Sequence, residues 1–106
     1  MAHATIKPTI IRLLREYKQR LNAENISIDQ MILFGSQTKG AKPWSDIDVA
    51  IVSKNLGKDS VDEYVTLRRL SRDIDLRIEP HPFSPQDFSV EEDPFAFEIR
   101  RTGIPV

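Results

Sequence analysis

Cysteine is absent from the chain, and glycine accounts for only four of its 106 residues. The lack of cysteine excludes disulfide bonds and thiolate metal sites, as expected for a protein of a reducing, cytoplasmic compartment. Long hydrophobic runs are also missing, so the sequence predicts neither a membrane-spanning helix nor the apolar core of a signal peptide. We therefore expect a soluble, cytoplasmic protein.

The charges of the chain are almost balanced. Fifteen lysines and arginines stand against sixteen aspartates and glutamates, which gives a formal net charge of −1. A nucleic-acid-binding domain usually carries a marked basic excess, so direct binding of nucleic acid is not expected. The length suits one compact domain that spans residues 1–106.

Hydrophobic periodicity predicts helices that alternate with short strands. Met31–Phe34 is a short apolar run and Ile47–Val52 is rich in β-branched residues, as in buried strands. In the first predicted helix, from Pro8 to about Asn22, the apolar positions are Ile10, Leu14, Tyr17 and Leu21. These patterns predict an α/β (α+β) fold in which helices flank a small mixed sheet of about three or more strands.

The second half of the chain has clear signals for element ends. Ser60 and Glu63 have capping-box spacing and open a helix whose expected apolar positions are Val61, Tyr64, Leu67 and Leu70. A third strand is predicted over Ile74–Glu79, and Pro80 and Pro82 are expected to end it. The last predicted helix starts at Asp93-Pro94 and ends at Gly103, with Phe95, Phe97 and Ile99 as its apolar positions.

Two aspartates stand at the start of the second predicted strand, in the segment Ser45-Asp46-Ile47-Asp48. Residues i and i+2 of a strand point to the same face, so the two carboxylates would lie together. Such like charges repel unless a cation neutralises them, and carboxylate oxygens suit Mg²⁺ or Mn²⁺. Asp75, on the third predicted strand, would complete a cluster of three metal ligands or act as the general base. Glu79, on the same predicted strand, is the less favoured candidate for the role of Asp75.

A turn with phosphate-binding features lies between the first two predicted strands. Gly35 lets the backbone turn tightly and approach a phosphate closely. Ser36 offers a hydroxyl and a backbone N–H, which would favour an anion further if a helix began there. Lys39 supplies positive charge, although it could also be an ordinary loop lysine. The sequence therefore predicts a phosphate-sized turn beside the carboxylates.

These motifs together resemble the nucleotidyltransferase domain of the DNA polymerase β superfamily. The resemblance rests on the Gly35-Ser36 turn, the Ser45–Asp48 segment and the later Ile74-Asp75-Leu76-Arg77 segment. The resemblance covers about residues 31–106. In size the chain is similar to the minimal nucleotidyltransferases of this superfamily, which are often paired with a helical HEPN protein as a toxin–antitoxin system. The resemblance implies that Gly35, Ser36 and Lys39 bind the nucleotide. It also implies that Asp46, Asp48 and Asp75 are the catalytic metal ligands and that Arg77 orients Asp75.

One position departs from the family pattern, and several aromatic residues have two interpretations. Gln37 stands where minimal members often carry an arginine, which removes one phosphate-directed charge. His81, between two prolines, is expected to be an exposed loop residue rather than a catalytic one. Trp44 could stack on a base or pack over the turn. The phenylalanines are expected in the core, although an excess would mark a partner surface; they are Phe83, Phe88, Phe95 and Phe97.

The resemblance implies transfer of a nucleoside monophosphate, in the first place AMP from Mg-ATP, to a hydroxyl group. The short, near-neutral chain has no tract for nucleic acid and little wall for a small molecule. The expected acceptor is therefore a side chain of a HEPN-type partner, which the modification would neutralise, so that this chain would act as an antitoxin. Two alternatives stay open: a module that neutralises a partner by contact alone, and transfer to a small molecule such as an aminoglycoside. Homo-oligomerisation also stays open.

Overall fold

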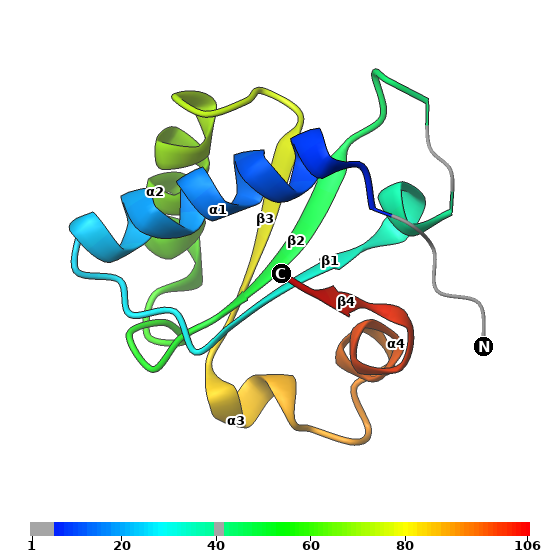
Figure 1. Cartoon of the computed structure of the whole chain (residues 1–106). Helices are drawn as coiled ribbons and strands as arrows, with labels where there is room; N and C mark the ends of the chain where they lie inside the picture. The colour runs from blue at the N-terminus through cyan, green and yellow to red at the C-terminus, as the bar shows by residue number, and fades with distance from the viewer. Residues whose placement is uncertain (1–5, 40–41) are drawn as a thin grey trace.

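A mixed, four-stranded sheet lies between two layers of helices in the part of the chain that the structure describes, residues 6–39 and 42–106. The structure is a computed structural model (Figure 1). Its elements are α1 (Pro8–Ala23), β1 (Gln30–Phe34), the 3₁₀ turn η1 (Gly35–Thr38), β2 (Ile47–Val52), α2 (Ser60–Arg72), β3 (Ile78–Phe83), α3 (Pro85–Phe88), α4 (Pro94–Thr102) and β4 (Ile104–Pro105). The predicted fold class is confirmed.

The sheet has the strand order β3-β2-β1-β4. Strand β1 runs antiparallel to both β2 and β4, whereas β2 and β3 are parallel. The short β4 was not predicted, because two residues give no periodic signal. Since η1 connects β1 to the segment before β2, the glycine–serine turn and the two aspartates meet at one end of the β1–β2 pair (Figure 1).

Helices α1 and α2 cover one face of the sheet (Figure 1). The predicted apolar positions of α1 are all buried: Ile10, Leu14, Tyr17 and Leu21. They pack in one cluster with residues of β2 and with Leu67 and Leu70 of α2. Tyr17 Oη donates a 2.8 Å hydrogen bond to the Leu67 carbonyl oxygen, and burial raises the pKa of this phenol. The periodicity therefore identified both the helix and its inward side.

The start of α2 differs from the prediction. Asp59, not Ser60, is the N-cap, and its carboxylate accepts a 3.1 Å hydrogen bond from the Asp62 N–H. Burial would raise the pKa of Glu63, but hydrogen bonds from the Gly57, Lys58 and Asp59 N–H groups lower it overall. The first turn of α2 also points Val61 outward, with 70% of its surface exposed.

Helices α3 and α4 cover the opposite face, where Ala50 and Val52 of β2 pack with Phe83 and Phe88. Within α4 the buried residues are Ala96 and Ile99, three positions apart. Phe95 and Phe97 are 46% and 49% exposed, so the expectation that they belong to the core was wrong, whereas Ile99 is buried. Residues 95, 97 and 99 repeat every two positions, whereas one side of a helix repeats every three or four.

The third strand begins four residues later than predicted and continues through both prolines. The odd-numbered residues of this segment bond to β2: Ile47 N donates to the carbonyl of Arg77, just before β3, and Ser53 N donates to the carbonyl of Phe83 at its end. The even-numbered Pro80 and Pro82 therefore place their nitrogens on the outer side of the strand. Because β3 is an edge strand, no ladder hydrogen bond is lost there. The prediction that these prolines end the strand was wrong for this reason.

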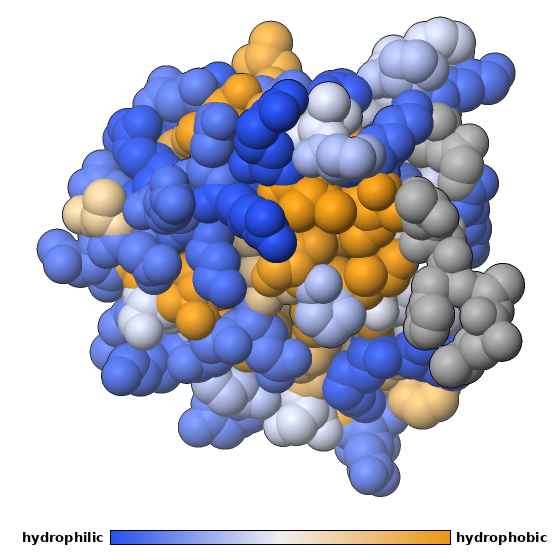
Figure 2. All heavy atoms as spheres, in the orientation of Figure 1, coloured by the Kyte–Doolittle hydropathy of each residue, from blue (hydrophilic) through white to orange (hydrophobic). Residues whose placement is uncertain are grey.

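Figure 2 shows the hydropathy of the side seen in Figure 1. Most of this side is hydrophilic, with an apolar area next to the N-terminal half of α1. Apolar residues only partly buried against the α1–α2 core include Ile6, Leu13 and Val106. Among the described residues, no helix has the length and apolarity needed to cross a membrane.

Candidate active site

Gly35 and Asp48 meet where β1 ends and β2 begins. Gly35 has a φ of +77°, a conformation that other residues adopt only with strain. A Cβ atom built on Gly35 would lie 2.7 Å from Asp48 Oδ2, closer than side chains tolerate. Glycine at this position therefore permits both the turn into η1 and the position of the Asp48 carboxylate.

Asp48 also contacts His81 on the neighbouring strand. His81 Nε2 lies 3.2 Å from Asp48 Oδ1, and the two side chains are 29% and 26% exposed. The expectation that His81 is an exposed loop residue was wrong, because β3 continues through Pro80 and Pro82 and places His81 beside Ala50. Only the strand pairing reveals this contact, since 33 residues separate the two side chains in the sequence.

Asp46 lies just before β2 and is exposed to solvent. Gln37 Nε2 donates hydrogen bonds to the carbonyl oxygens of Ser45, at 3.2 Å, and Asp46, at 3.4 Å. Gln37 thus ties η1 to the backbone of the aspartate segment. The sequence interpretation considered only its missing charge and overlooked this connection.

Asp75 lies in the turn before β3 rather than on the strand. Its two oxygens accept hydrogen bonds from Arg77 Nε and Nη2, both at 3.0 Å, and the Arg77 N–H adds a third at 2.8 Å. These Arg77 hydrogen bonds hold the pKa of Asp75 below its ordinary value, against the opposing effect of burial. Arg77 Nη1 also donates to the Pro43 carbonyl, which links the turn to the segment before β2. The predicted contact between Arg77 and Asp75 is therefore present.

Glu79 is the acidic residue paired with Asp48 in the sheet, where the parallel register matches Asp48 with Glu79. Placing Asp75 on the same strand face as Asp46 and Asp48 was wrong, because β3 starts at Ile78. The Glu79 carboxylate receives hydrogen bonds and charge from α2: Tyr64 Oη donates to it, and Arg68 Nη1 lies 3.1 Å away. The hydrogen bond to Glu79 raises the pKa of Tyr64.

Within the described residues, no group of three or more His, Asp or Glu side chains is close enough to hold a metal ion. Asp46 and Asp48 stay the predicted metal ligands, and the Glu79 carboxylate is held by Tyr64 and Arg68 of α2. Ser36 and Lys39 are both exposed on the turn, as a phosphate-binding role requires, and that role stays a prediction. The rest of the predicted turn, Gly40 and Ala41, lies outside the described residues. Trp44 is 73% exposed, which does not fit packing over the turn.

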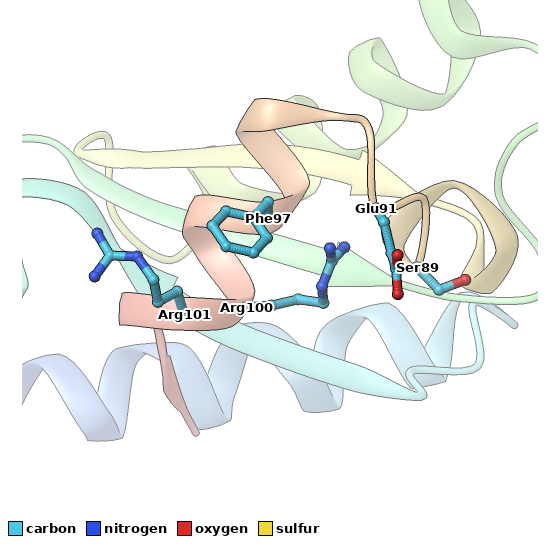
Figure 3. Close-up of a pocket in the computed structure, with 5 residues that line it drawn as sticks. All are labelled: Ser89, Glu91, Phe97, Arg100 and Arg101. Atoms are coloured by element: carbon cyan, nitrogen blue, oxygen red, sulfur yellow. The ribbon is translucent and has the colours of Figure 1, made fainter.

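A hollow of about 680 Å³ lies elsewhere, at α4 and the segment before it (Figure 3). Its lining residues are Ser89, Glu91, Phe97, Arg100 and Arg101. Both arginines are already engaged: Arg100 donates to the Phe88 carbonyl, and Arg101 Nη2 lies 2.8 Å from Glu98 Oε1. The predicted site residues do not line this hollow. We therefore place the candidate active site at the β1–β2 end of the sheet.

The comparisons with known proteins identify the family of the chain. Residues 11–99 match the family model described as "Nucleotidyltransferase domain", a segment that includes the turn and all the acids discussed above. A similar protein of Methanocaldococcus jannaschii, "Putative protein adenylyltransferase MJ1305", is 35% identical over 83 residues. This match covers 74% of the chain and 54% of the relative, so the chain spans about half of the relative's length. Since the family match extends over most of the chain, the chain belongs to the nucleotidyltransferase domain family.

Proposed function

We propose that this domain transfers AMP from Mg-ATP to a hydroxyl group of another protein, with release of pyrophosphate. The observation that carries the proposal is the packing of Asp48 against Gly35. This packing places the two aspartates at the start of β2 beside the glycine–serine turn. The family supplies the reaction class. The name of the archaeal relative supports a protein acceptor.

Asp46 and Asp48 are the residues that would hold Mg²⁺ or Mn²⁺. Their chemistry suits Mg²⁺, because proteins usually bind this ion through one or two carboxylates together with substrate phosphates and water. The absent side chain of Gly35 also leaves room beside Asp48 Oδ2. When bound, the ion would neutralise charge on the phosphates and polarise the attacking oxygen.

The other residues of the site would bind the triphosphate and accept a proton. The Ser36 hydroxyl and the Lys39 ammonium are exposed, so both can reach the β and γ phosphates. The acceptor oxygen would attack the α-phosphorus while the bond to pyrophosphate breaks. Its proton would pass to a carboxylate, and the sheet register favours Glu79 over Asp75 for this role.

The proposed acceptor is a tyrosine of a HEPN-type helical protein, whose toxicity the modification would remove. The resemblance to minimal nucleotidyltransferases is the basis for this pairing. An acceptor protein needs a surface to contact, and large apolar side chains are exposed on several separate elements. They are Val61 and Val65 on α2, Phe95 and Phe97 on α4, and Trp44 and Leu76 in the turns before β2 and β3.

Intact mass spectrometry tests the proposal directly. The chain is incubated with Mg-ATP and the product of a neighbouring helical reading frame, and we expect the partner to gain one or more adenylates. Asp46→Ala and Asp48→Ala should abolish the gain, whereas Asp62→Ala should not. Asp62 is a matched control because it is an exposed aspartate on α2, outside the site. An unmodified but neutralised partner would instead favour the contact-only binding module.

The same assay separates the two candidates for the third carboxylate. If Glu79 accepts the proton, Glu79→Gln should remove most of the transfer, while Asp75→Asn should retain much of it. The reverse order of effects would restore Asp75 to the role that the sequence predicted. Adenylation of an aminoglycoside, with no change in the partner's mass, would favour the small-molecule alternative.

A further inference from the structure

The His81 ring packs against two phenylalanine rings. Its centroid lies 5.0 Å from that of Phe34 on β1 and 5.5 Å from that of Phe95 at the start of α4. Phe34 and Phe95 also meet each other, with centroids 5.6 Å apart. These aromatic contacts restrict the orientation of the ring. His81 therefore presents Nε2 to Asp48 from a defined position.

The contact between His81 and Asp48 has a defined direction. An ionised carboxylate only accepts hydrogen bonds, so His81 Nε2 is the donor and Asp48 Oδ1 the acceptor. The second oxygen, Oδ2, is adjacent to Gly35, and no described residue donates a hydrogen bond to it. The histidine thus fixes one oxygen of Asp48 and leaves the other exposed toward the turn.

We propose that His81 is a positioning residue of the nucleotidyltransferase site: its Nε2–H holds the Asp48 carboxylate in the orientation that binds a divalent cation. This inference rests on the proposed function. A carboxylate on a strand can rotate about its side-chain torsions, and a change of χ1 would move both oxygens from their present positions. Hydrogen-bond partners of this kind usually change metal affinity by about 10–100-fold when removed.

Titration of the whole chain with Mn²⁺ alone, followed by calorimetry and by the electron paramagnetic resonance of the bound ion, tests this role. We expect His81→Phe, which keeps an aromatic ring but has no N–H, to weaken Mn²⁺ binding by about tenfold or more. His81→Gln restores an N–H donor at similar reach and should recover much of the affinity. A packing control is Phe83→Leu, because Phe83 belongs to the same aromatic cluster and contacts Phe95 and Phe88. It should lower the melting temperature without changing Mn²⁺ affinity.

The outcomes separate this inference from the proposed function. If the wild-type chain binds Mn²⁺ no better than Asp48→Asn does, the metal site is wrong and the positioning role is overturned with it. If Asp48→Asn loses binding but His81→Phe binds as tightly as wild type, only the positioning role is overturned. Tighter binding by His81→Phe would also overturn it, since the histidine would then compete with the ion for Asp48.

Discussion

At the residue scale, Gly35 shows how one missing side chain can serve both the fold and the site. Its left-handed φ makes the turn from β1 into η1, and its open Cα accommodates Asp48 Oδ2. The sequence predicted the first of these properties from the turn. The space for Asp48 beside Gly35 depends on the pairing of β2 with β1, which a local motif does not encode.

We expect Gly35→Ala to damage both properties. The strained φ should lower the free energy of unfolding by about 1–3 kcal/mol, and the added Cβ should displace the Asp48 carboxylate and weaken Mn²⁺ binding. Urea denaturation and Mn²⁺ titration measure the two effects separately. Gly57→Ala is a matched control, because Gly57 has a φ of +98° and its Cβ would lie 2.7 Å from Ser84 Cβ. Gly57→Ala should destabilise the chain without affecting Mn²⁺; equal loss of Mn²⁺ affinity in both variants would contradict the proposed packing.

At the scale of elements, the turn between α2 and β3 determines which acid reaches the sheet. Alternation at residues 74–79 resembled a strand, but Asp75 instead closes a turn with Arg77. The first strand residue is Ile78, which pairs with Ile47. The alternating pattern correctly identified a strand in this part of the chain. It was wrong about which residues enter the sheet, because pairing with β2 determines where the hydrogen-bonded ladder begins.

The Asp75–Arg77 contact should make stability depend on pH. Hydrogen bonds from Arg77 lower the pKa of Asp75 in the folded chain, so the contact stabilises the fold above the ordinary pKa of about 3.9 and is lost as pH falls through the folded value. We expect Asp75→Asn to lower the free energy of unfolding by about 1 kcal/mol at pH 7. The difference from wild type should shrink below about pH 4.

Urea denaturation at pH 7 and at pH 3 measures this change. The control is Asp62→Asn, which removes one exposed negative charge from α2. It should change the free energy of unfolding little at either pH. If Asp75→Asn lowers the free energy of unfolding as much at pH 3 as at pH 7, the side chain stabilises the turn by packing rather than through its charge.

At the scale of the whole molecule, the sheet order brings three distant segments to one place. The turn after β1, the start of β2 and the middle of β3 contribute Gly35, Asp48 and His81. Helix α4 contributes Phe95 to the same site. The carboxylates of Asp46 and Asp48 also lie at this end of the sheet, so a negatively charged substrate would be repelled there.

We expect ATP binding to require a divalent cation. Without one, Asp46, Asp48 and the triphosphate repel each other, by roughly 1–4 kcal/mol for charges about 4 Å apart near a protein surface. Calorimetric titration with and without Mg²⁺ should show at least about tenfold weaker binding in its absence. Asp48→Asn should reduce the benefit of Mg²⁺ without unfolding the domain. Equal affinity with and without the cation would remove the basis for the metal site.

The sequence by itself determined the features that depend on neighbouring residues. The inward side of α1 follows from a 3.6-residue period, and β2 follows from its β-branched run. The Gly35-Ser36 turn and the Asp46–Asp48 spacing are local as well, and the family resemblance that they carry implied the reaction class. These signals need only the chain within a few residues.

Only the tertiary structure decided which distant groups complete the site. Pro80 and Pro82 are compatible with β3 because it is an edge strand, and that position is set by the whole sheet. Strand pairing then aligns Glu79 with Asp48 and brings His81 to the Asp48 carboxylate. The physical reason is that register and edge position arise from long-range burial and hydrogen bonding, which no local spacing of residues encodes.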